Sequence, residues 1–134
     1  MIKPVNTSGK RKDAVARAVI RPGKGTVRIN HIGLDVYEPR MARLKISEPI
    51  LLAGDYASKV DIRVNVRGGG VMGQAEAVRL AIARGLVQFS KDKNLEKEFL
   101  NYDRHLLVAD VRQREARKPN THGNARGKTQ KSYR

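Results

Sequence analysis

The chain has no cysteine and no tryptophan, and aromatic residues make up only 4% of it. Without cysteine it can form neither disulfides nor thiolate metal sites, so redox chemistry does not indicate a compartment. The opening residues Met-Ile-Lys-Pro-Val lack the apolar core of a signal peptide, and no apolar run approaches the length that spans a bilayer. We therefore expect a soluble, cytoplasmic protein.

Acidic residues are also scarce. The 134 residues include 28 Lys or Arg against 13 Asp or Glu, which gives a formal net charge of +15. A positive field of this size favours a large polyanionic partner, most simply a nucleic acid. An anionic membrane fits less well, because membrane-surface segments need large apolar side chains beside the basic ones. In the most basic segment, the C-terminal one, only Tyr133 is a large side chain.

That segment, residues 112–134, contains eight basic residues and one acid, Glu115. Because it is almost without apolar residues and is broken by Pro119 and two glycines, it cannot build a core. We expect residues 1–111 to form one globular domain and residues 112–134 an extended basic tail that reaches a polyanion. A merely solubilising terminus is the alternative.

Four stretches have the residue pattern of strands. Residues 14–20 place Ala14, Ala16, Ala18 and Ile20 on one face, and the turn Pro22-Gly23-Lys24-Gly25 predicts a hairpin with residues 26–32. Together these would form a two-stranded basic ribbon. Residues 60–67 alternate most clearly, and residues 106–111 are a weaker candidate. Residues 1–10 are polar and predict no ordered element.

Helices are expected between these strands. One begins at Glu38-Pro39, buries Met41 and Leu44 and ends at Pro49. Ser47 is expected to cap a second short helix through Leu52, which Gly54 stops. Residues 74–89 have apolar residues at helical spacing, and Asp92 or Asn94 can cap a further helix through residue 102. The order of elements predicts an α+β, two-layer sandwich with helices on one sheet face.

The most suggestive motif is Gly68-Gly69-Gly70-Val71-Met72-Gly73, between the predicted strand 60–67 and the predicted helix 74–89. It matches GxGxxG, but the second parallel strand of a Rossmann unit is missing, and Gln74-Ala75 replace the Lys-Ser/Thr of a P-loop. Three roles remain open: amides that bind an RNA phosphate at a helix N-terminus, a purely structural tight turn, or a nucleotide site.

Catalytic patterns are weak. His31, His105 and His122 are widely separated and lack metal-ligand spacing. Asp103 with His105 is the one candidate acid–base pair, and no nucleophile accompanies it in the sequence. We therefore expect no enzymatic activity and no cofactor.

Several longer motifs resemble one family. They are Ser8 to Ala18 (SGKRKDAVARA), Val66 to Gly70 with Gly73-Gln74-Ala75, Asp110-Val111-Arg112, Arg114-Glu115 and the ending Gln130 to Arg134 (QKSYR). On these residues, over essentially the whole length, the chain resembles the S-nine family of small-subunit ribosomal proteins, in its archaeal and eukaryotic form.

The resemblance implies a fold similar to the second domain of ribosomal protein S-five, with a left-handed βαβ crossover. It implies a structural role in the head of the small subunit, with the 3′ domain of the rRNA, peptidyl-site tRNA and neighbouring head proteins as partners. The expected rRNA contacts are Lys10, Arg11, Lys12, Arg17, Arg67, Gly68, Gly69, Gly70, Gln74, Arg112, Arg114, Arg117, Lys118, Arg126 and Lys128. The expected tRNA contacts are Lys131, Tyr133 and Arg134.

Two rival functions remain. The glycine motif could belong to a nucleotide-binding enzyme, since small-molecule kinases share a related fold. Charge alone is equally compatible with a general DNA-binding protein.

Overall fold

The computed structural model describes residues 3–113 and 115–119. A five-stranded sheet has the order β1-β2-β5-β3-β4. Its strands are β1 (Val5–Arg11), β2 (Ala14–Pro22), β3 (Val27–Ile29), β4 (Ile32–Gly33) and β5 (Val60–Arg67). All neighbouring pairs are antiparallel except β3 and β5, which are parallel.

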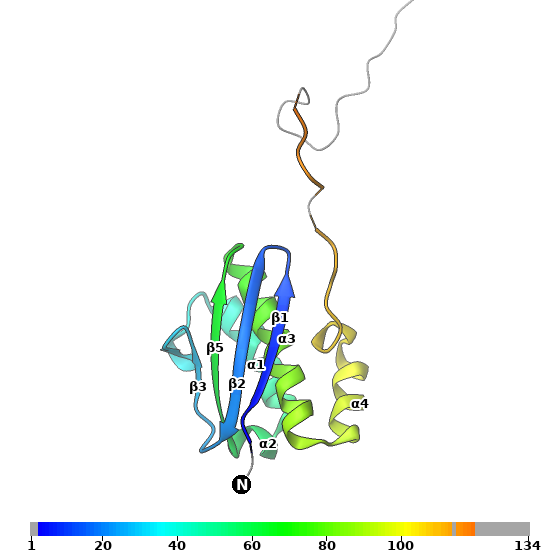
Figure 1. Cartoon of the computed structure of the whole chain (residues 1–134). Coiled ribbons are helices and arrows are strands. Elements are labelled where there is room, and N and C mark those ends of the chain that lie inside the picture. The colour runs from blue at the N-terminus through cyan, green and yellow to red at the C-terminus, as the bar shows by residue number, and fades with distance from the viewer. Residues whose placement is uncertain (1–2, 114, 120–134) are drawn as a thin grey trace, which may run out of the picture.

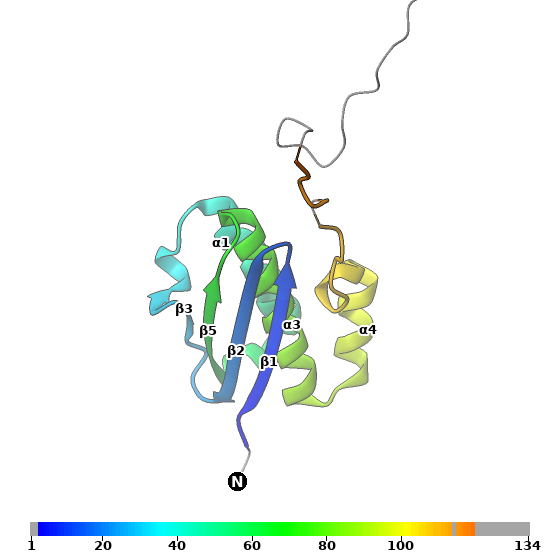
Figure 2. The same cartoon turned by 45° about the horizontal axis from the view of Figure 1, so that its top comes forward.

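The helices pack on one face of this sheet, and the other face is left uncovered (Figures 1 and 2). They are α1 (Arg40–Ala53), α2 (Asp55–Ser58), α3 (Val71–Ser90) and α4 (Lys93–Tyr102), with the 3₁₀ turns η1 (Leu34–Val36) and η2 (Arg104–Leu106). Helix α3 lies across β1 and β2 and beside α1. The α+β class and the helices on one sheet face are thus as the sequence predicts.

The core lies between α3 and the inward faces of β2 and β5. The predicted inward residues of β2, from Ala14 to Ile20, are all buried, and those of β5 are Val60, Ile62, Val64 and Val66. Small alanines on both β2 and α3 let the helix approach the sheet closely, and Ile82 of α3 is completely buried.

The expected hairpin between β2 and β3 is wrong, because β5 lies between them. Residues 23–26 wrap around the start of β5 instead of turning back. The Gly23 and Gly25 amides donate to the carbonyls of Lys59 and Val60, both at 2.9 Å. The carboxylate of Asp61 accepts the amides of Lys24 at 3.0 Å and Thr26 at 3.1 Å. These hydrogen bonds hold residues 23–26 against the start of β5.

The N-terminal residues also differ from expectation, because residues 5–11 form edge strand β1. All seven pair with β2, and the Thr7 hydroxyl donates to the Ala81 carbonyl of α3 at 2.8 Å. Gly9 is buried against the α3 backbone. A polar sequence thus forms a strand because β2 pairs with it along its whole length and α3 packs against it.

Helix α1 is one helix, so the predicted break at Pro49 and the Ser47 cap are wrong. Ser47 lies within α1 and donates to the Arg43 carbonyl at 2.8 Å. The buried residues are Ala42, Ile46, Pro49 and Ala53, whereas Met41 and Leu44 are exposed. Burial of the proline ring at this spacing outweighs the lost backbone hydrogen bond. Gly54 ends the helix as predicted.

The later elements follow the sequence more closely. Strand β5 has the predicted bounds, α3 begins three residues earlier than predicted, and Asp92 caps α4 through the Asn94 amide at 2.9 Å. The strand predicted over residues 106–111 is absent there. In its place η2 ends at the fully buried Leu106, and irregular chain follows.

Candidate nucleic-acid interface

The uncovered face of the sheet is strongly basic. Strand alternation that buries the core residues points the intervening side chains outward. Six of these are cations, and they come from four strands: Lys10, Arg17, Arg21, Arg28, Arg63 and Arg67. The pairing register places them in adjacent rows, with Arg28 directly beside Arg63. Among the described residues that point outward from these four strands, Asp61 is the sole acid.

These six cations lack intramolecular neutralisation. Within the described part of the chain, none of them forms an ion pair or a side-chain hydrogen bond. Asp61 is occupied by the loop amides, and the hydrogen bond from Lys24, followed by that from Thr26, holds its carboxyl pKa below its ordinary value. Like charges directly opposite in a sheet destabilise it. The Arg28–Arg63 row is therefore unfavourable until an anion neutralises it.

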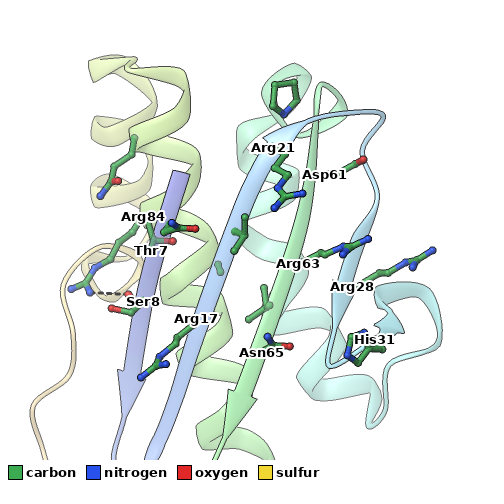
Figure 3. A pocket seen from close by; sticks show the side chains of 16 residues that line it. Thr7, Ser8, Arg17, Arg21, Arg28, His31, Asp61, Arg63, Asn65 and Arg84 are labelled. Carbon is green, nitrogen blue, oxygen red and sulfur yellow. Dashed lines mark hydrogen bonds between the residues drawn. The ribbon is translucent and has the colours of Figure 1, made fainter. Parts of the chain in front are cut away.

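The arginines surround an open cavity of about 980 Å³ on this face. Figure 3 shows Arg17, Arg21, Arg28 and Arg63 projecting from three neighbouring strands. Its other polar lining residues include Ser8, Asn65 and His31, and its lining contains no Phe, Tyr or Trp. The cavity thus offers cations and hydrogen-bond donors suited to phosphate oxygens, without an aromatic platform on which bases could stack.

The glycine motif lies at one end of this basic face. Gly68 and Gly69 have φ of 79° and 67°, and Gly70 precedes α3 as its N-cap. A Cβ at Gly69 would come within 3.0 Å of the Ala14 amide nitrogen, and one at Gly68 would collide with the Asp13 carbonyl. Glycine is thus required here by the turn and by its packing on the β1–β2 hairpin, which supports the tight-turn interpretation. The Gln74 side-chain amide donates to the Gly68 carbonyl at 3.1 Å and secures the loop.

The fold brings together sequence-predicted residues that are far apart in the chain. Lys12 is exposed at the β1–β2 turn, beside the glycine loop, and Arg67 pairs in register with Val15. Lys10 and Arg17 lie on the adjoining sheet face. The exposed cations Lys12 and Arg67, the glycine loop and the sheet face therefore form one continuous surface.

Arg11 differs, because it faces a set of carboxylates. Its Nε lies 2.7 Å from Glu76 Oε2, and its Nη1 forms an ion pair with Asp110. Lys45 of α1 contacts the other Glu76 oxygen at 3.0 Å. Although burial opposes ionisation of Glu76, the bonds from Lys45 and Arg11 bring its pKa below the ordinary value. Arg11 thus has an intramolecular role that the sequence did not indicate.

Of the expected tail contacts, Arg112 forms a bidentate pair with Asp110, with Nη2 at 2.7 Å from Oδ2. This side-chain bond is the main reason why the pKa of Asp110 lies well below its ordinary value. Arg117 is exposed, and Lys118 lies 3.9 Å from Glu115. The other expected tail contacts lie outside the described residues: Arg114, Arg126, Lys128, Lys131, Tyr133 and Arg134.

Sequence reasoning missed Arg21, Arg28 and Arg63 as site residues. The signal for Arg21 and Arg63 was present, because alternation puts them on the same outward faces as Arg17 and Arg67. Arg28 could not be assigned, because its position follows from the parallel pairing of β3 with β5.

The one candidate acid–base pair is a structural contact. The Asp103 carboxylate accepts the backbone amide of His105 at 3.0 Å, and its other oxygen accepts Arg79 at 3.0 Å. The His105 ring is not part of either bond. Over residues 3–113 and 115–119, no three His, Asp or Glu side chains gather as a metal site, and no helix is long and apolar enough to cross a membrane.

Fold and surface together define a small, basic α+β domain whose open sheet face presents unneutralised arginines. The family model described as "Ribosomal protein S9/S16" matches residues 9–134. The chain therefore belongs to this ribosomal protein family.

Two relatives agree with this assignment. The chain is 51% identical over 133 residues to the small ribosomal subunit protein uS9 of Methanothrix thermoacetophila, covering 99% of this chain and 100% of that one. It is 54% identical over 133 residues to the uS9 protein of Desulfurococcus amylolyticus, covering 99% and 94%.

Proposed function

We propose that the protein is a structural constituent of the small ribosomal subunit that binds rRNA of the head through its open sheet face. The observation that carries this is the row of unpaired arginines on a surface without a covering layer. Family membership supplies the ribosomal setting. The protein acts as a binding and assembly component, with no catalytic role and no cofactor.

The sheet face recognises the RNA backbone. Guanidinium groups bind phosphate oxygens in a bidentate manner, whereas sequence-specific RNA recognition depends on unstacked bases held by aromatic or planar groups. The sheet face has several guanidinium groups, and no Phe, Tyr or Trp lines its cavity. It therefore binds the phosphates of a folded 3′-domain rRNA segment, with Arg28 and Arg63 at the centre.

The glycine loop extends this surface. Gly68, Gly69 and Gly70 leave the backbone accessible beside Lys12 and Arg67, so their amides can approach an rRNA phosphate. ATP binding is the rival, and it lacks the lysine and hydroxyl that a P-loop would use. DNA binding is the second rival, which the ribosomal family disfavours.

In this proposal residues 1–111 form the rRNA-binding domain and residues 112–134 an extended basic tail. Its proximal cations bind rRNA, and Lys131, Tyr133 and Arg134 contact peptidyl-site tRNA near the anticodon stem-loop. The likeness to S-five-type domains, with a left-handed crossover, is supported by the parallel β3–β5 pair, whose connection carries α1 on the helical face. Head proteins are expected as further neighbours.

Salt-dependent rRNA binding tests the sheet face. Arg63→Gln is expected to make the negative slope of log K for rRNA binding against log salt shallower by up to about one unit, because one phosphate contact is lost. Arg40→Gln is the matched control, since Arg40 is equally cationic and exposed but begins α1 on the helical side. Equal slopes for the two variants, at equal folding, would refute the assignment of this face.

Deletion of Arg134 tests the tail. One charge-assisted phosphate contact contributes about 1.5–3 kcal/mol before neighbouring cations compensate, so tRNA affinity of reconstituted subunits should fall at least roughly tenfold with assembly intact. Lys118→Ala should instead weaken rRNA binding without a selective tRNA defect. Identical tRNA dissociation from wild-type and Arg134-deleted subunits would exclude the tRNA contact.

A further inference from the structure

The segment from Asp103 to Arg112 has little regular structure, yet three arginines hold it to the body. Arg79 of α3 donates to Asp103 at 3.0 Å, and Arg84 of α3 donates to the Leu107 carbonyl at 3.0 Å. Arg11 of β1 pairs with Asp110. The two α3 arginines are themselves anchored, Arg79 by Glu48 at 2.5 Å and Arg84 by the Ser8 carbonyl at 3.2 Å. The segment is thus fixed at three points by guanidinium groups.

Asp110 is the joint between the body and the residues that follow. Its carboxylate accepts the Arg112 amide at 3.0 Å and the Arg112 guanidinium at 2.7–3.0 Å, besides its ion pair with Arg11. Through Arg11 and Glu76 this network extends to Lys45 on α1. The Asp110 side chain is 14% exposed, whereas that of Arg112 is 79% exposed. One carboxylate therefore connects an inner arginine to an outer one.

These bonds restrict the backbone. An Asp carboxylate that accepts the amide two residues later holds a local turn. On its own such a turn can swing with the loop, but the ion pair with Arg11 ties it to β1 and, through Glu76, to α3. The direction of the chain at Arg112 is consequently determined by β1 and α3 together.

We propose that Asp110 is a positioning residue that sets the direction in which the C-terminal tail leaves the body. The inference rests on the tail function proposed above, because a tail aimed in advance loses less conformational entropy when it reaches tRNA. Arg112 has a double role. Its Nε and Nη2 are held by Asp110, while Nη1 bonds none of the described residues and is available to an rRNA phosphate.

The isolated full-length protein allows a direct test, because it has no native cysteine to interfere with labelling. Spin labels at Lys97→Cys on α4 and Ala116→Cys beyond the joint occupy exposed positions. The distance distribution between them is expected to be narrow in the parent and clearly broader with Asp110→Asn. Asp110→Glu, which keeps the charge, should restore much of the narrow distribution.

Glu98→Gln is the matched control, because it removes one negative charge from exposed α4, where Glu98 has no described hydrogen-bond or ion-pair partner. It should leave the distribution unchanged. Glu98→Gln should melt as the parent does. Asp110→Asn should melt cooperatively at a modestly lower temperature, because it loses the ion pair with Arg11 while Arg11 retains Glu76. Distance distributions of equal width for the parent and Asp110→Asn would overturn the inference.

A second measurement connects the joint to function. Subunits reconstituted with Asp110→Asn should bind peptidyl-site tRNA roughly threefold to tenfold more weakly at unchanged rRNA affinity. The distance measurement involves no tRNA, so it tests the positioning role of Asp110 by itself. The Arg134 deletion tests the tRNA contact separately. Broadened distances with wild-type tRNA affinity would refute the functional part of the inference.

Discussion

Gly9 packs closely against the α3 backbone, and Gly9→Ala tests the packing that holds edge strand β1. A Cβ at this position would lie 2.8 Å from the Ala81 nitrogen and 3.1 Å from the Leu80 Cβ, and closer still to the Ala77 carbonyl oxygen. Two of these neighbours are helix backbone atoms, which cannot rotate away. Since nonbonded carbon contacts settle at about 3.5–4.0 Å, β1 and α3 must separate by roughly 1 Å.

The expected loss of stability follows from this shift. Overpacking of a core costs about 1–3 kcal/mol, and the lower backbone entropy of unfolded alanine returns about 0.4–1 kcal/mol. Because two of the three neighbours are backbone atoms, the overpacking cost should lie in the upper part of that range, at about 2–3 kcal/mol. The net loss should then be about 1–2.6 kcal/mol, and at about 4–8 °C per kcal/mol the melting temperature should fall by roughly 4–20 °C. Urea unfolding followed by circular dichroism would measure it as a lower midpoint at unchanged slope.

Gly33→Ala is the control for Gly9→Ala. No atom lies within 4 Å of the Cβ that Gly33 would gain, and its φ of −62° suits alanine. Its stability should change by less than about 0.5 kcal/mol. If both variants unfold at the same urea concentration, the close approach of β1 to α3 has no energetic weight and the reasoning fails.

Four further predictions concern the core, the domain boundary, the glycine loop and acid stability. Ile62→Asp buries an unpaired charge and should abolish the cooperative melt, whereas the exposed Asn65→Asp should not. A chain ending at Val111 should keep a folded circular dichroism spectrum; an unfolded one would place the boundary elsewhere. Gly69→Val should weaken rRNA binding, and saturable micromolar ATP binding by the wild type would favour the enzyme rival instead. Glu76 and Asp110 have folded pKa values below their ordinary 4.5 and 3.8, so they stabilise the fold above those values. Unfolding midpoints should therefore fall as the pH drops through about 4.5 and below. Midpoints that stay constant over this acidic range would contradict the prediction.

Elements with a strong local signal were predictable from the sequence. Strand β5 alternates through eight residues, and both of its faces behave as the alternation indicates. Helix α4 has a capping Asp92 ahead of Leu95 and Phe99, which are buried four residues apart. In such segments local propensity and tertiary environment favour the same structure.

Elements that depend on distant partners were not predictable. Strand β1 contains Asn6, Ser8 and Gly9, which have little intrinsic preference for a strand, and it forms through β2 and α3. The segment after Leu106 has the apolar pattern of a strand but pairs with no strand, and arginines from α3 and β1 hold it instead. These are contacts between residues far apart in the chain, which no local window contains.

The basic surface was only partly predictable, because its composition also depends on contacts between strands far apart in the chain. Alternation indicates which arginines of a strand point away from the core, but not which strands are neighbours. Only the insertion of β5 between β2 and β3 brings Arg63 beside Arg28 and near Arg17. The sequence left the glycine motif open as a phosphate-binding loop, a tight turn or a nucleotide site, and its packing on the β1–β2 hairpin supports the tight turn.

The distribution of acids explains how a folded protein can present so many unneutralised cations. Apart from Glu115, which pairs with Lys118, the carboxylates that form ion pairs among the described residues gather where α1, α3 and the C-terminal segment meet. There they pair with Arg11, Lys45, Arg79 and Arg112. On the sheet face the one outward acid, Asp61, is bound to backbone amides. An RNA that reaches this face therefore need not displace intramolecular ion pairs, so its phosphates gain the full attraction of the arginines. The ion pairs of Arg11 lie on the opposite, helical face of the sheet, because Arg11 is paired in register with the buried Ala14, so an anion bound to the open face would leave them intact.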